Sequence, residues 1–381
     1  MTAGQDLPPH LLGLVADDLT GAGDSAVGFA EQGWRVELLL DTEHTSRPSH
    51  EYPESRPTVL AVTTGSRALS DDRAAEVTDR AVTAVLAAGA ERLYLKIDST
   101  VRGSVAGQIR GALTAWRRRY PAAGAIVCPA FPAQNRTVHD GTVLVGGVPV
   151  SQTVAATDPV TPLASGDLRV IVPGAVTGTL DQVGSVSLLL LDATNDSDLD
   201  AIAHHAAAAG AQTLVVGSGG LAAAVARCWA VERSPAPPPT IGTGRILLAV
   251  SSLHPVTTEQ LRLLSTTVQA VHVDILATPS GEIATPSAAA AALAARVSSA
   301  LADPTYGALI IVGGDGAAAI LAQLSTERIL IDGAVSGGCP TGIVVGGTAD
   351  GLRLVTKSGG FGTPDTLATI TARLRAPGAT H

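Results

Sequence analysis

The chain has 381 residues, of which 46% are hydrophobic and only 15% are charged. This composition excludes an intrinsically disordered chain, because such chains lack the apolar residues needed for a core. The formal net charge of −9 argues against a nucleic-acid-binding protein, which usually carries a basic patch. The length favours two domains over one large core.

We expect neither a secretory signal nor a membrane span. The first ten residues lack the basic start and apolar core of a signal peptide, and no apolar run reaches the roughly 18 residues of a span. Cys128, Cys228 and Cys339 are far apart and form no CxxC pattern. We therefore expect reduced thiols in a cytoplasmic protein, and no metal site made by the chain.

Apolar runs alternate with helical patterns through the first part of the chain. Strands are predicted at residues 11–16, 35–40, 58–62, 92–97, 125–128, 188–192 and 213–216. Helices are predicted at 22–32, 71–88, 104–118, 198–209 and 221–230, with a hairpin at 142–150. This alternation predicts a mostly parallel sheet with helices on both faces, which binds ligands beyond the carboxyl ends of its strands.

A proline-rich segment divides the chain. Four prolines fall within five residues in the segment 233–240, which predicts an extended linker between domains 1–232 and 241–381. In the second domain, strands are predicted at 245–250, 270–275, 308–312, 328–331 and 342–345, and helices at 257–264, 287–301 and 317–324. The predicted fold is α/β, with two domains that each hold a mostly parallel sheet flanked by helices, and a ligand cleft between them.

The first candidate site follows the first predicted strand. Asp17, Asp18 and Asp24 lie there, and a carboxylate at this edge can orient a hydroxyl or accept its proton. Helix capping is the structural alternative, but it accounts for only one of these carboxylates. The segment Gly21–Asp24 has the letters of the GAGD motif of ribokinase-like sugar kinases. That motif lies late in their chains, so we interpret the likeness as chance.

The second candidate site is Lys96-Ile-Asp-Ser-Thr-Val-Arg-Gly103, at the end of another predicted strand. An arginine near a helix start grips anions with two hydrogen bonds, assisted by backbone N–H groups. An internal ion pair with a helix cap is the structural alternative. The candidate binding residues here are Lys96, Asp98, Ser99, Arg102 and Gly103. The chain has only two lysines, Lys96 and Lys357, and both lie in such motifs.

A third polar segment follows Cys128. Asn135, Arg136, Thr137, His139 and Asp140 could line a polar pocket, and Arg136 is the residue that we expect to contact a ligand. A lone histidine such as His139 is more often structural than catalytic.

Polar loops follow three strands or apolar runs of the second domain. Glycines let a backbone approach a phosphate, and a helix N-terminus attracts the anion. The three loops together predict a nucleotide site. Its candidate residues are Ser251, Ser252, Gly313, Gly314, Asp315, Gly316, Gly359 and Gly360.

Taken in order, these motifs resemble those of the four-carbon acid sugar kinases. The matching segments are 16–22, 96–103, 129–132, 217–222, 313–316 and 356–362. The resemblance implies ATP-dependent phosphorylation of the terminal hydroxyl of threonate, erythronate or 3-oxo-tetronate. It also implies that domain 1–232 binds the acid sugar, with Asp18, Lys96, Asp98 and Arg102, and that domain 241–381 binds ATP. The chain departs from the family pattern at Gly23, Asn135, His139 and Ser251–His254.

The resulting hypothesis is a kinase in which Arg102 and Lys96 hold the substrate carboxylate. Asp17, Ser99, Gly103 and Arg136 complete the substrate site. Either Asp18 or Asp98 is the catalytic base, and Mg²⁺ bridges ATP oxygens.

Two alternatives stay open. A nucleotide-dependent dehydrogenase would need a GxGxxG after the first strand, which is missing, and a non-catalytic acid-sugar sensor would not need the nucleotide loops. The acid, its stereochemistry and assembly into a homo-oligomer are left open.

Overall fold

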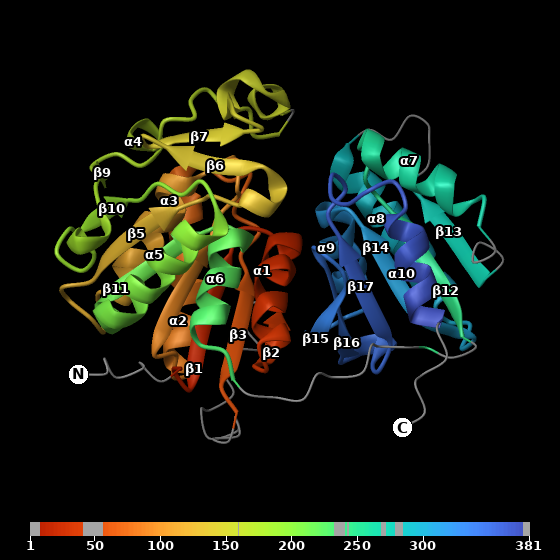
Figure 1. Cartoon of the computed structure of the whole chain (residues 1–381). Coiled ribbons are helices and arrows are strands. Elements are labelled where there is room, and N and C mark those ends of the chain that lie inside the picture. The colour runs from red at the N-terminus through yellow and green to blue at the C-terminus, as the bar shows by residue number, and fades with distance from the viewer. Residues whose placement is uncertain are drawn as a thin grey trace. The chain divides into compact units, whose positions relative to one another are not determined.

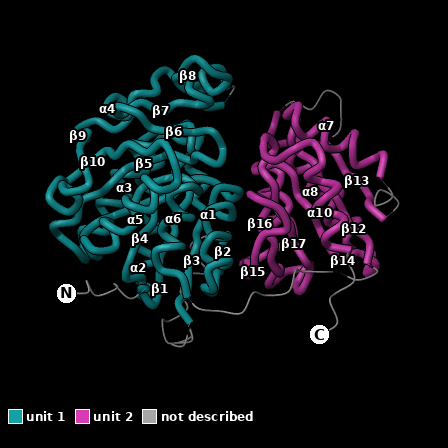
Figure 2. Tube along the Cα trace, viewed as in Figure 1, with its two compact units in different colours: residues 1–232 teal, residues 233–381 magenta. Residues whose placement is uncertain are grey.

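The computed structural model describes residues 8–40, 56–158, 160–231, 241, 244–267, 272–278 and 285–375. The chain divides into two compact units, residues 1–232 and 233–381 (Figure 2). Each unit holds strands flanked by helices (Figure 1). The predicted linker at 233–240 lies outside the described residues.

The first unit is built on a parallel sheet with the strand order β2-β3-β1-β4-β11-β5-β10-β9. Every strand pair of this sheet among the described residues is parallel, as the alternating pattern predicts. The strands are β1 (Leu11–Ala16), β2 (Arg35–Leu39), β3 (Thr58–Thr63), β4 (Arg92–Lys96), β5 (Gly124–Cys128), β9 (Val176–Thr177), β10 (Leu188–Leu190) and β11 (Thr213–Gly217).

Helices cover both faces of this sheet. The helices are α1 (Leu19–Glu31), α2 (Asp71–Ala87), α3 (Val105–Trp116), the short α4 (Leu168–Ile171), α5 (Asp196–Ala209) and α6 (Gly219–Cys228). The connections through α1 and α5 lead to strands nearer to β2 in the sheet order. Those through α2 and α3 lead to strands nearer to β9. Right-handed connections therefore place the two pairs on opposite faces. Consistently, α2 packs on α3, while α6 packs on α1 and α5.

The predicted hairpin at 142–150 belongs to a larger element. It is part of an antiparallel three-stranded sheet of β6 (Arg136–His139), β7 (Thr142–Val145) and β8 (Val148–Pro149). Gly146 and Gly147 both have positive φ and form the tight turn between β7 and β8. The strand β6 was not predicted, because its polar side chains give no apolar run.

The second unit has the strand order β13-β12-β14-β17-β16-β15. The strands are β12 (Arg245–Val250), β13 (Val273–Ala277), β14 (Tyr306–Val312), β15 (Arg328–Ser336), β16 (Cys339–Val345) and β17 (Arg353–Lys357). Its helices are α7 (Pro255–Leu264), α8 (Pro286–Ala300), α9 (Gly314–Gln323) and α10 (Thr366–Arg375). No helix in the described ranges is both long enough and apolar enough to cross a bilayer.

One strand of the second sheet departs from the parallel pattern. The strands β13, β12, β14 and β17 are parallel, but β16 is antiparallel to both β17 and β15. A tight turn at Gly338, with a φ of +70°, joins β15 to β16. Such a hairpin needs no crossover helix, so the short segment before β16 permits only the antiparallel arrangement. The strand β17 and the helix α10 were not predicted.

Strand register gathers the ends of the first unit's strands at one edge. Thr63, Ala16, Lys96, Gly217 and Cys128 are aligned in that order across β3, β1, β4, β11 and β5. Because all of these strands point the same way, the loops that follow them leave the sheet side by side. The candidate motifs of the first unit therefore meet at this edge.

Close packing of α2 on α3 depends on glycine. A Cβ on Gly111 would lie 2.2 Å from the carbonyl oxygen of Ala75. Helix propensity alone would make Gly111→Ala stabilising by up to about 1 kcal/mol. We expect instead a loss of about 1–3 kcal/mol in the free energy of unfolding, because the helices must separate. Urea denaturation measures this, and the exposed Thr114→Ala on the same helix is the control. A stabilised Gly111→Ala would contradict the packing argument.

Candidate functional site

The two aspartates after β1 have different surroundings. Asp17 is 2% exposed and accepts two hydrogen bonds from Arg67, at 2.6 Å from Nε and 3.0 Å from Nη2. Asp18 is the N-cap of α1 and accepts hydrogen bonds from the Gly21 N–H at 2.8 Å and the Thr20 hydroxyl at 2.9 Å. The capping alternative therefore applies to Asp18, although 22% of its side chain remains exposed.

Arg67 connects the first two motifs, and sequence reasoning missed it. Its Nη2 lies 3.0 Å from Asp18 Oδ1 and 3.7 Å from Asp98 Oδ1. The arginine follows β3, in the polar run 63–67 that ends a predicted strand at the same edge, and that position was the available signal. A Cβ on Gly103 would lie 2.4 Å from the Arg67 carbonyl oxygen, which together with its φ of +81° accounts for glycine there.

The second motif folds around Asp98. Both of its carboxylate oxygens accept hydrogen bonds from Arg102, each at 3.0 Å, and Thr100 donates its N–H and its hydroxyl. Arg102 also pairs with Asp158 at 2.9 Å. Burial alone would raise the pKa of Asp98, but Arg67 and Arg102 outweigh it and hold that pKa well below its usual range.

The neighbouring aspartates respond differently to the same cations. Burial opposes ionisation of Asp18, but Arg67 and Lys96 lower its pKa overall. For Asp17, burial is the stronger effect and raises the pKa despite the Arg67 contact. The internal ion pairs that were the structural alternative are therefore present at Asp17 and Asp98.

Two more cations lie at this edge. Lys96 is 5% exposed, and its Nζ donates to the carbonyl oxygen of Ile97 at 2.9 Å, with no ion pair within 4.0 Å in the described ranges. Arg136, on β6, donates to the carbonyl oxygen of Gln134. Burial lowers the pKa of Arg136, while the nearby charges of Asp98 and Asp24 act to raise it. Lys96 and Arg136 therefore add positive charge to this edge of the sheet.

Asp24 stands apart from the other carboxylates. No hydrogen bond or ion pair to its carboxylate is present in the part of the chain that the structure describes. Burial raises its pKa to about 6, with Lys96 acting in the opposite direction. The structure thus brings Asp24 into the cluster. The sequence analysis counted it among three candidate carboxylates but did not name it as a catalytic or binding residue.

The remaining predicted residues of the first unit divide by exposure. Ser99 and Gly103 are half-buried in the loop after β4. Asn135 and His139 are exposed, so their side chains add little to a closed pocket. Asp158 was not predicted, because it lies 56 residues from Arg102 in a segment without a regular pattern.

Three loops of the second unit converge at the ends of the adjacent strands β12, β14 and β17. A Cβ on Gly313 or Gly316 would lie 2.3 Å from the Ser251 hydroxyl, and one on Gly359 would lie 2.0 Å from the Ser252 hydroxyl. The Thr257 hydroxyl ties two of the loops, since it donates to Ser252 and to the carbonyl oxygen of Gly359. The structure therefore brings together the residues predicted for a nucleotide site.

The N-terminus of α9 has the form of a phosphate cradle. Its N-cap is Gly313, with a φ of +111° and no side chain to bind the first N–H groups. Those N–H groups and the helix dipole suit an anion. Asp315 is exposed in the first turn, next to the cradle. No group of three or more His, Cys, Asp or Glu side chains in the described ranges could hold a metal ion.

Lys357 is placed beneath the third loop. It is 0% exposed, and its Nζ donates to the carbonyl oxygen of Ser358 at 2.9 Å. Burial lowers its pKa to about 8. Gly360 lies beside the His254 ring, where a Cβ would be 3.3 Å from Nε2.

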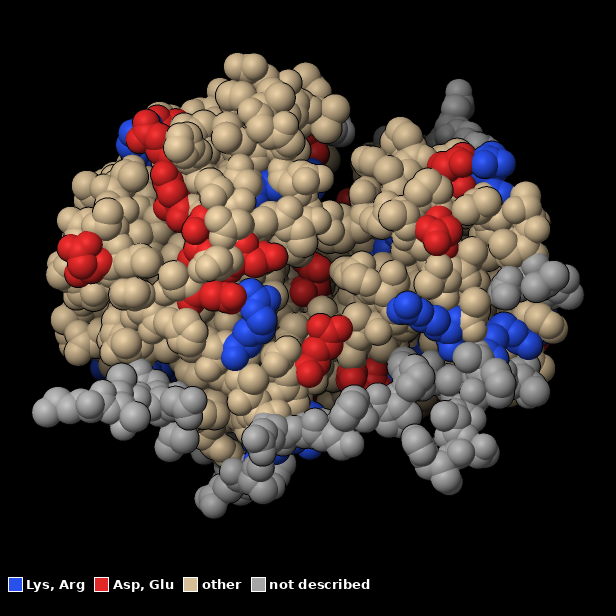
Figure 3. Space-filling view, in the orientation of Figure 1, with Lys and Arg blue, Asp and Glu red and all other residues tan. Residues whose placement is uncertain are grey.

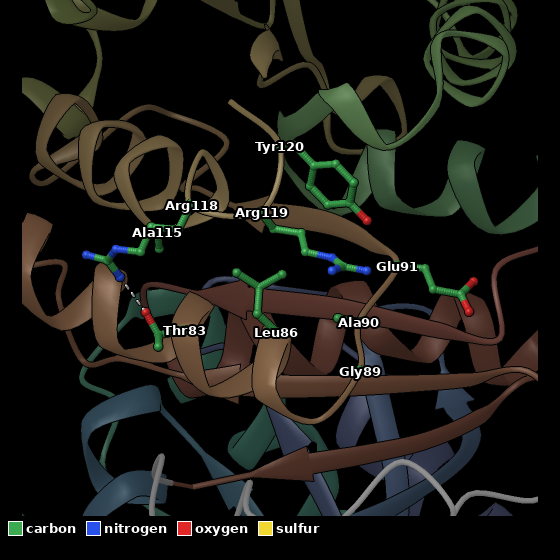
Figure 4. A pocket seen from close by; sticks show the side chains of 9 residues that line it. All are labelled: Thr83, Leu86, Gly89, Ala90, Glu91, Ala115, Arg118, Arg119 and Tyr120. Carbon is green, nitrogen blue, oxygen red and sulfur yellow. Dashed lines mark hydrogen bonds between the residues drawn. The ribbon is translucent and has the colours of Figure 1, made fainter. Parts of the chain in front are cut away.

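A separate pocket of about 350 Å³ lies at the opposite edge of the first sheet, among Thr83, Glu91, Arg118, Arg119 and Tyr120 (Figure 4). Glu91 directly precedes β4, whereas the candidate site follows it.

On the face drawn in Figure 3, Asp and Glu side chains gather over the first unit, and Lys and Arg side chains form separate groups.

The Arg67 contacts predict a pH-dependent stability. Arg67→Gln leaves three carboxylates without their shared cation, so we expect a loss of about 3–5 kcal/mol in the free energy of unfolding at pH 7. The lowered pKa values of Asp18 and Asp98 supply stability above their ordinary value of 3.8, and this stability is lost as the pH falls. The deficit should therefore shrink toward pH 3.

Denaturation of wild type and variant at several pH values measures this effect. Arg73→Gln is the matched control, because its pair with Glu76 is mostly exposed, and we expect little change from it. A deficit that stays constant from pH 7 to pH 3 would contradict the charge argument.

Comparison with known proteins identifies two matching domain models. Residues 12–187 match the sugar-binding N-terminal domain, and residues 279–367 match the nucleotide-binding C-terminal domain. The chain is 35% identical to the D-threonate kinase of Bordetella bronchiseptica, over 96% of this chain and 97% of that protein. It is 28% identical to the D-erythronate kinase of Heliobacterium modesticaldum (65% and 59% covered) and 24% identical to the 3-oxo-tetronate kinase of Brucella melitensis (92% and 93%).

Solved structures agree with this result. A Bordetella bronchiseptica protein with bound citrate, described as a domain-swapped dimer, has 34% identity and a TM-score of 0.53, over 97% of this chain and 99% of that one. A Salmonella typhimurium LT2 protein has a TM-score of 0.76 at 20% identity, with 96% and 99% covered, and shows the shared fold. With this level of identity over nearly its whole length, the chain belongs to the family of four-carbon acid sugar kinases.

Proposed function

We propose that the chain is an ATP-dependent kinase that phosphorylates the terminal hydroxyl of a four-carbon acid sugar. One observation carries the proposal: a buried cluster of cations and carboxylates lies in the first unit, and an uncapped glycine cradle lies in the second. The relatives named D-threonate, D-erythronate and 3-oxo-tetronate kinase support the choice of acid.

The substrate side of the proposal rests on charge. A sugar acid carries one carboxylate, and we assign Lys96 and Arg136, beside Arg102, as the cations that bind it. Arg102 already has two partners, Asp98 and Asp158, so it holds the loop in shape as well as adding positive charge. Asp17, Ser99 and Gly103 complete the proposed substrate-binding residues.

The nucleotide side rests on backbone geometry. Phosphate oxygens would accept hydrogen bonds from the first N–H groups of α9, between Gly313 and Gly316, with Gly314 in the same turn. The loops at 251–252 and 359–360 border this position. When bound, Mg²⁺ would neutralise phosphate charge, and the carboxylate of Asp315 is the acidic group of this turn.

Phosphoryl transfer requires alignment and charge neutralisation more than covalent chemistry from the protein. Asp18 and Asp98 are proposed to keep Arg67, Arg102 and Lys96 in place around the substrate. A ligand cleft between the two units, expected from the sequence, stays a prediction. The same holds for a cytoplasmic location.

We also propose assembly into a homo-oligomer. The support is the related Bordetella bronchiseptica structure, which is described as a domain-swapped dimer.

A substrate panel tests the kinase function. Wild type is incubated with ATP, Mg²⁺ and, in turn, D-threonate, D-erythronate or 3-oxo-tetronate, and ADP release is followed by a coupled assay. We expect release with at least one acid and none without acid. Lack of release with every acid would contradict the kinase. A nicotinamide absorbance change in a parallel assay would favour a dehydrogenase, and acid binding without either reaction would favour a sensor.

The glycine cradle gives a second prediction. Gly316→Val would place a branched side chain against Ser251, so we expect ATP affinity to fall roughly tenfold or more, while binding of the acid stays unchanged. Isothermal calorimetry with a non-hydrolysable ATP analogue measures this. Ala318→Val, exposed two residues further along α9, is the matched control. Equal affinity of both variants would contradict a phosphate site at this helix.

A further inference from the structure

The carboxylates of the first unit's site fall into two groups. Asp17, Asp18 and Asp98 each accept hydrogen bonds from Arg67, Arg102 or neighbouring backbone and hydroxyl groups. Carboxylates held in this way are weak proton acceptors, because their partners stabilise the ionised form. This applies to Asp18 and Asp98, whose pKa values are lowered.

Among the described residues, Asp24 forms no ion pair and caps no helix. It lies in α1, on the same helix face as Gly21 three residues earlier, where a Cβ would lie 2.8 Å from Lys96 Nζ. No hydrogen bond to the Asp24 carboxylate is present within the described residues, although the side chain is more than half buried. A mostly buried carboxylate without a hydrogen-bond donor beside it has less to stabilise its ionised form, which suits a proton acceptor.

The residues packed around Asp24 include a glycine next to its carboxylate. A Cβ on Gly219, at the start of α6, would lie 2.5 Å from Asp24 Oδ2 and 2.9 Å from the Phe131 ring. Glycine at this position therefore keeps space beside the carboxylate. Ser218, the N-cap of α6, is turned away to donate to the carbonyl oxygen of Ala130 at 2.8 Å.

The charged and titratable groups that face Asp24 come from three places. Lys96 and Tyr94 lie on β4, Arg136 lies on β6, and Asp18 lies just before α1. The two cations suit an acidic substrate bound beside Asp24. Burial keeps the pKa of Asp24 near 6, which suits proton transfer close to neutral pH.

Building on the proposed kinase function, we propose that Asp24 is the general base that accepts the proton of the acid sugar's terminal hydroxyl. In this step the hydroxyl oxygen bonds to the terminal phosphorus of ATP. The bond from that phosphorus to the bridging oxygen breaks, and ADP leaves with the electron pair. The hydroxyl proton passes to an oxygen of Asp24 and then to water. Lys96 and Arg136 hold the substrate so that this hydroxyl faces Asp24.

The test uses the full chain with Asp24→Asn, which keeps the shape of the side chain and removes the base. With the acid that wild type phosphorylates, we expect kcat to fall roughly 10²–10⁴-fold and KM for the acid to change less than about threefold. The kcat/KM of wild type should fall below a pH of about 6, and this limb should be absent from Asp24→Asn and present in Asp24→Glu. Asp200→Asn, an exposed carboxylate paired with Arg227, is the control and should keep wild-type rates.

Thermal unfolding separates a catalytic role from a structural one. Because burial raises its pKa, ionised Asp24 destabilises the fold above its ordinary pKa, and this effect vanishes as the pH falls below 3.8. Asp24→Asn should therefore have a higher Tm than wild type at pH 8 and nearly the same Tm at pH 3.5. A lower Tm at pH 8 together with lost acid binding would show a structural role and overturn the proposal.

The outcomes also separate this inference from the proposed function. If wild type releases no ADP with any acid of the panel, the kinase function itself fails. If wild type is active and Asp24→Asn keeps its kcat within about threefold, only the assignment of the base is overturned. A large loss of kcat in Asp18→Asn or Asp98→Asn, with normal turnover in Asp24→Asn, would return the base to one of those residues.

Discussion

The site of the first unit depends on one guanidinium group. Arg67 lies 2.6, 3.0 and 3.7 Å from the nearest oxygens of Asp17, Asp18 and Asp98. These aspartates come from the loops after β1 and β4, while the arginine follows β3, so a single cation joins three loops. Without it, three carboxylates would face one another at low exposure, and their repulsion would open the edge of the sheet.

This arrangement also determines which groups remain for chemistry. Arg67 and Arg102 neutralise Asp18 and Asp98, and that neutralisation makes these two carboxylates poor bases. Lys96 and Asp24 lie outside these ion pairs, and the charge of Lys96 acts on the Asp24 carboxylate. A cation for the substrate and a base for its hydroxyl can thus coexist with a stable cluster, because structural and reactive roles fall on different side chains.

Much of this could be predicted from sequence, for a clear physical reason. Alternating apolar runs define the parallel sheet, and parallel strands bring the loops after Ala16 and Lys96 to one edge. Contacts between distant segments could not be predicted, and Asp158 with Arg102 is an example. The lack of a described partner for Asp24 could not be predicted either, because it depends on the hydrogen bonds that its neighbours form with other residues. A strand was predicted at 342–345, but the antiparallel direction of β16 was not, because an apolar run has the same pattern in either direction.

Glycine in these motifs acts by making space for polar atoms as much as by flexibility. At Gly21 a Cβ would meet Asp18 and Lys96, and at Gly219 it would meet Asp24. In the second unit, a Cβ at Gly316 or Gly359 would meet the hydroxyl of Ser251 or Ser252. In each case the backbone approaches a polar side chain so closely that even a methyl group would displace it. The glycines of these motifs therefore mark the positions, in each unit, where a polar side chain lies against the backbone.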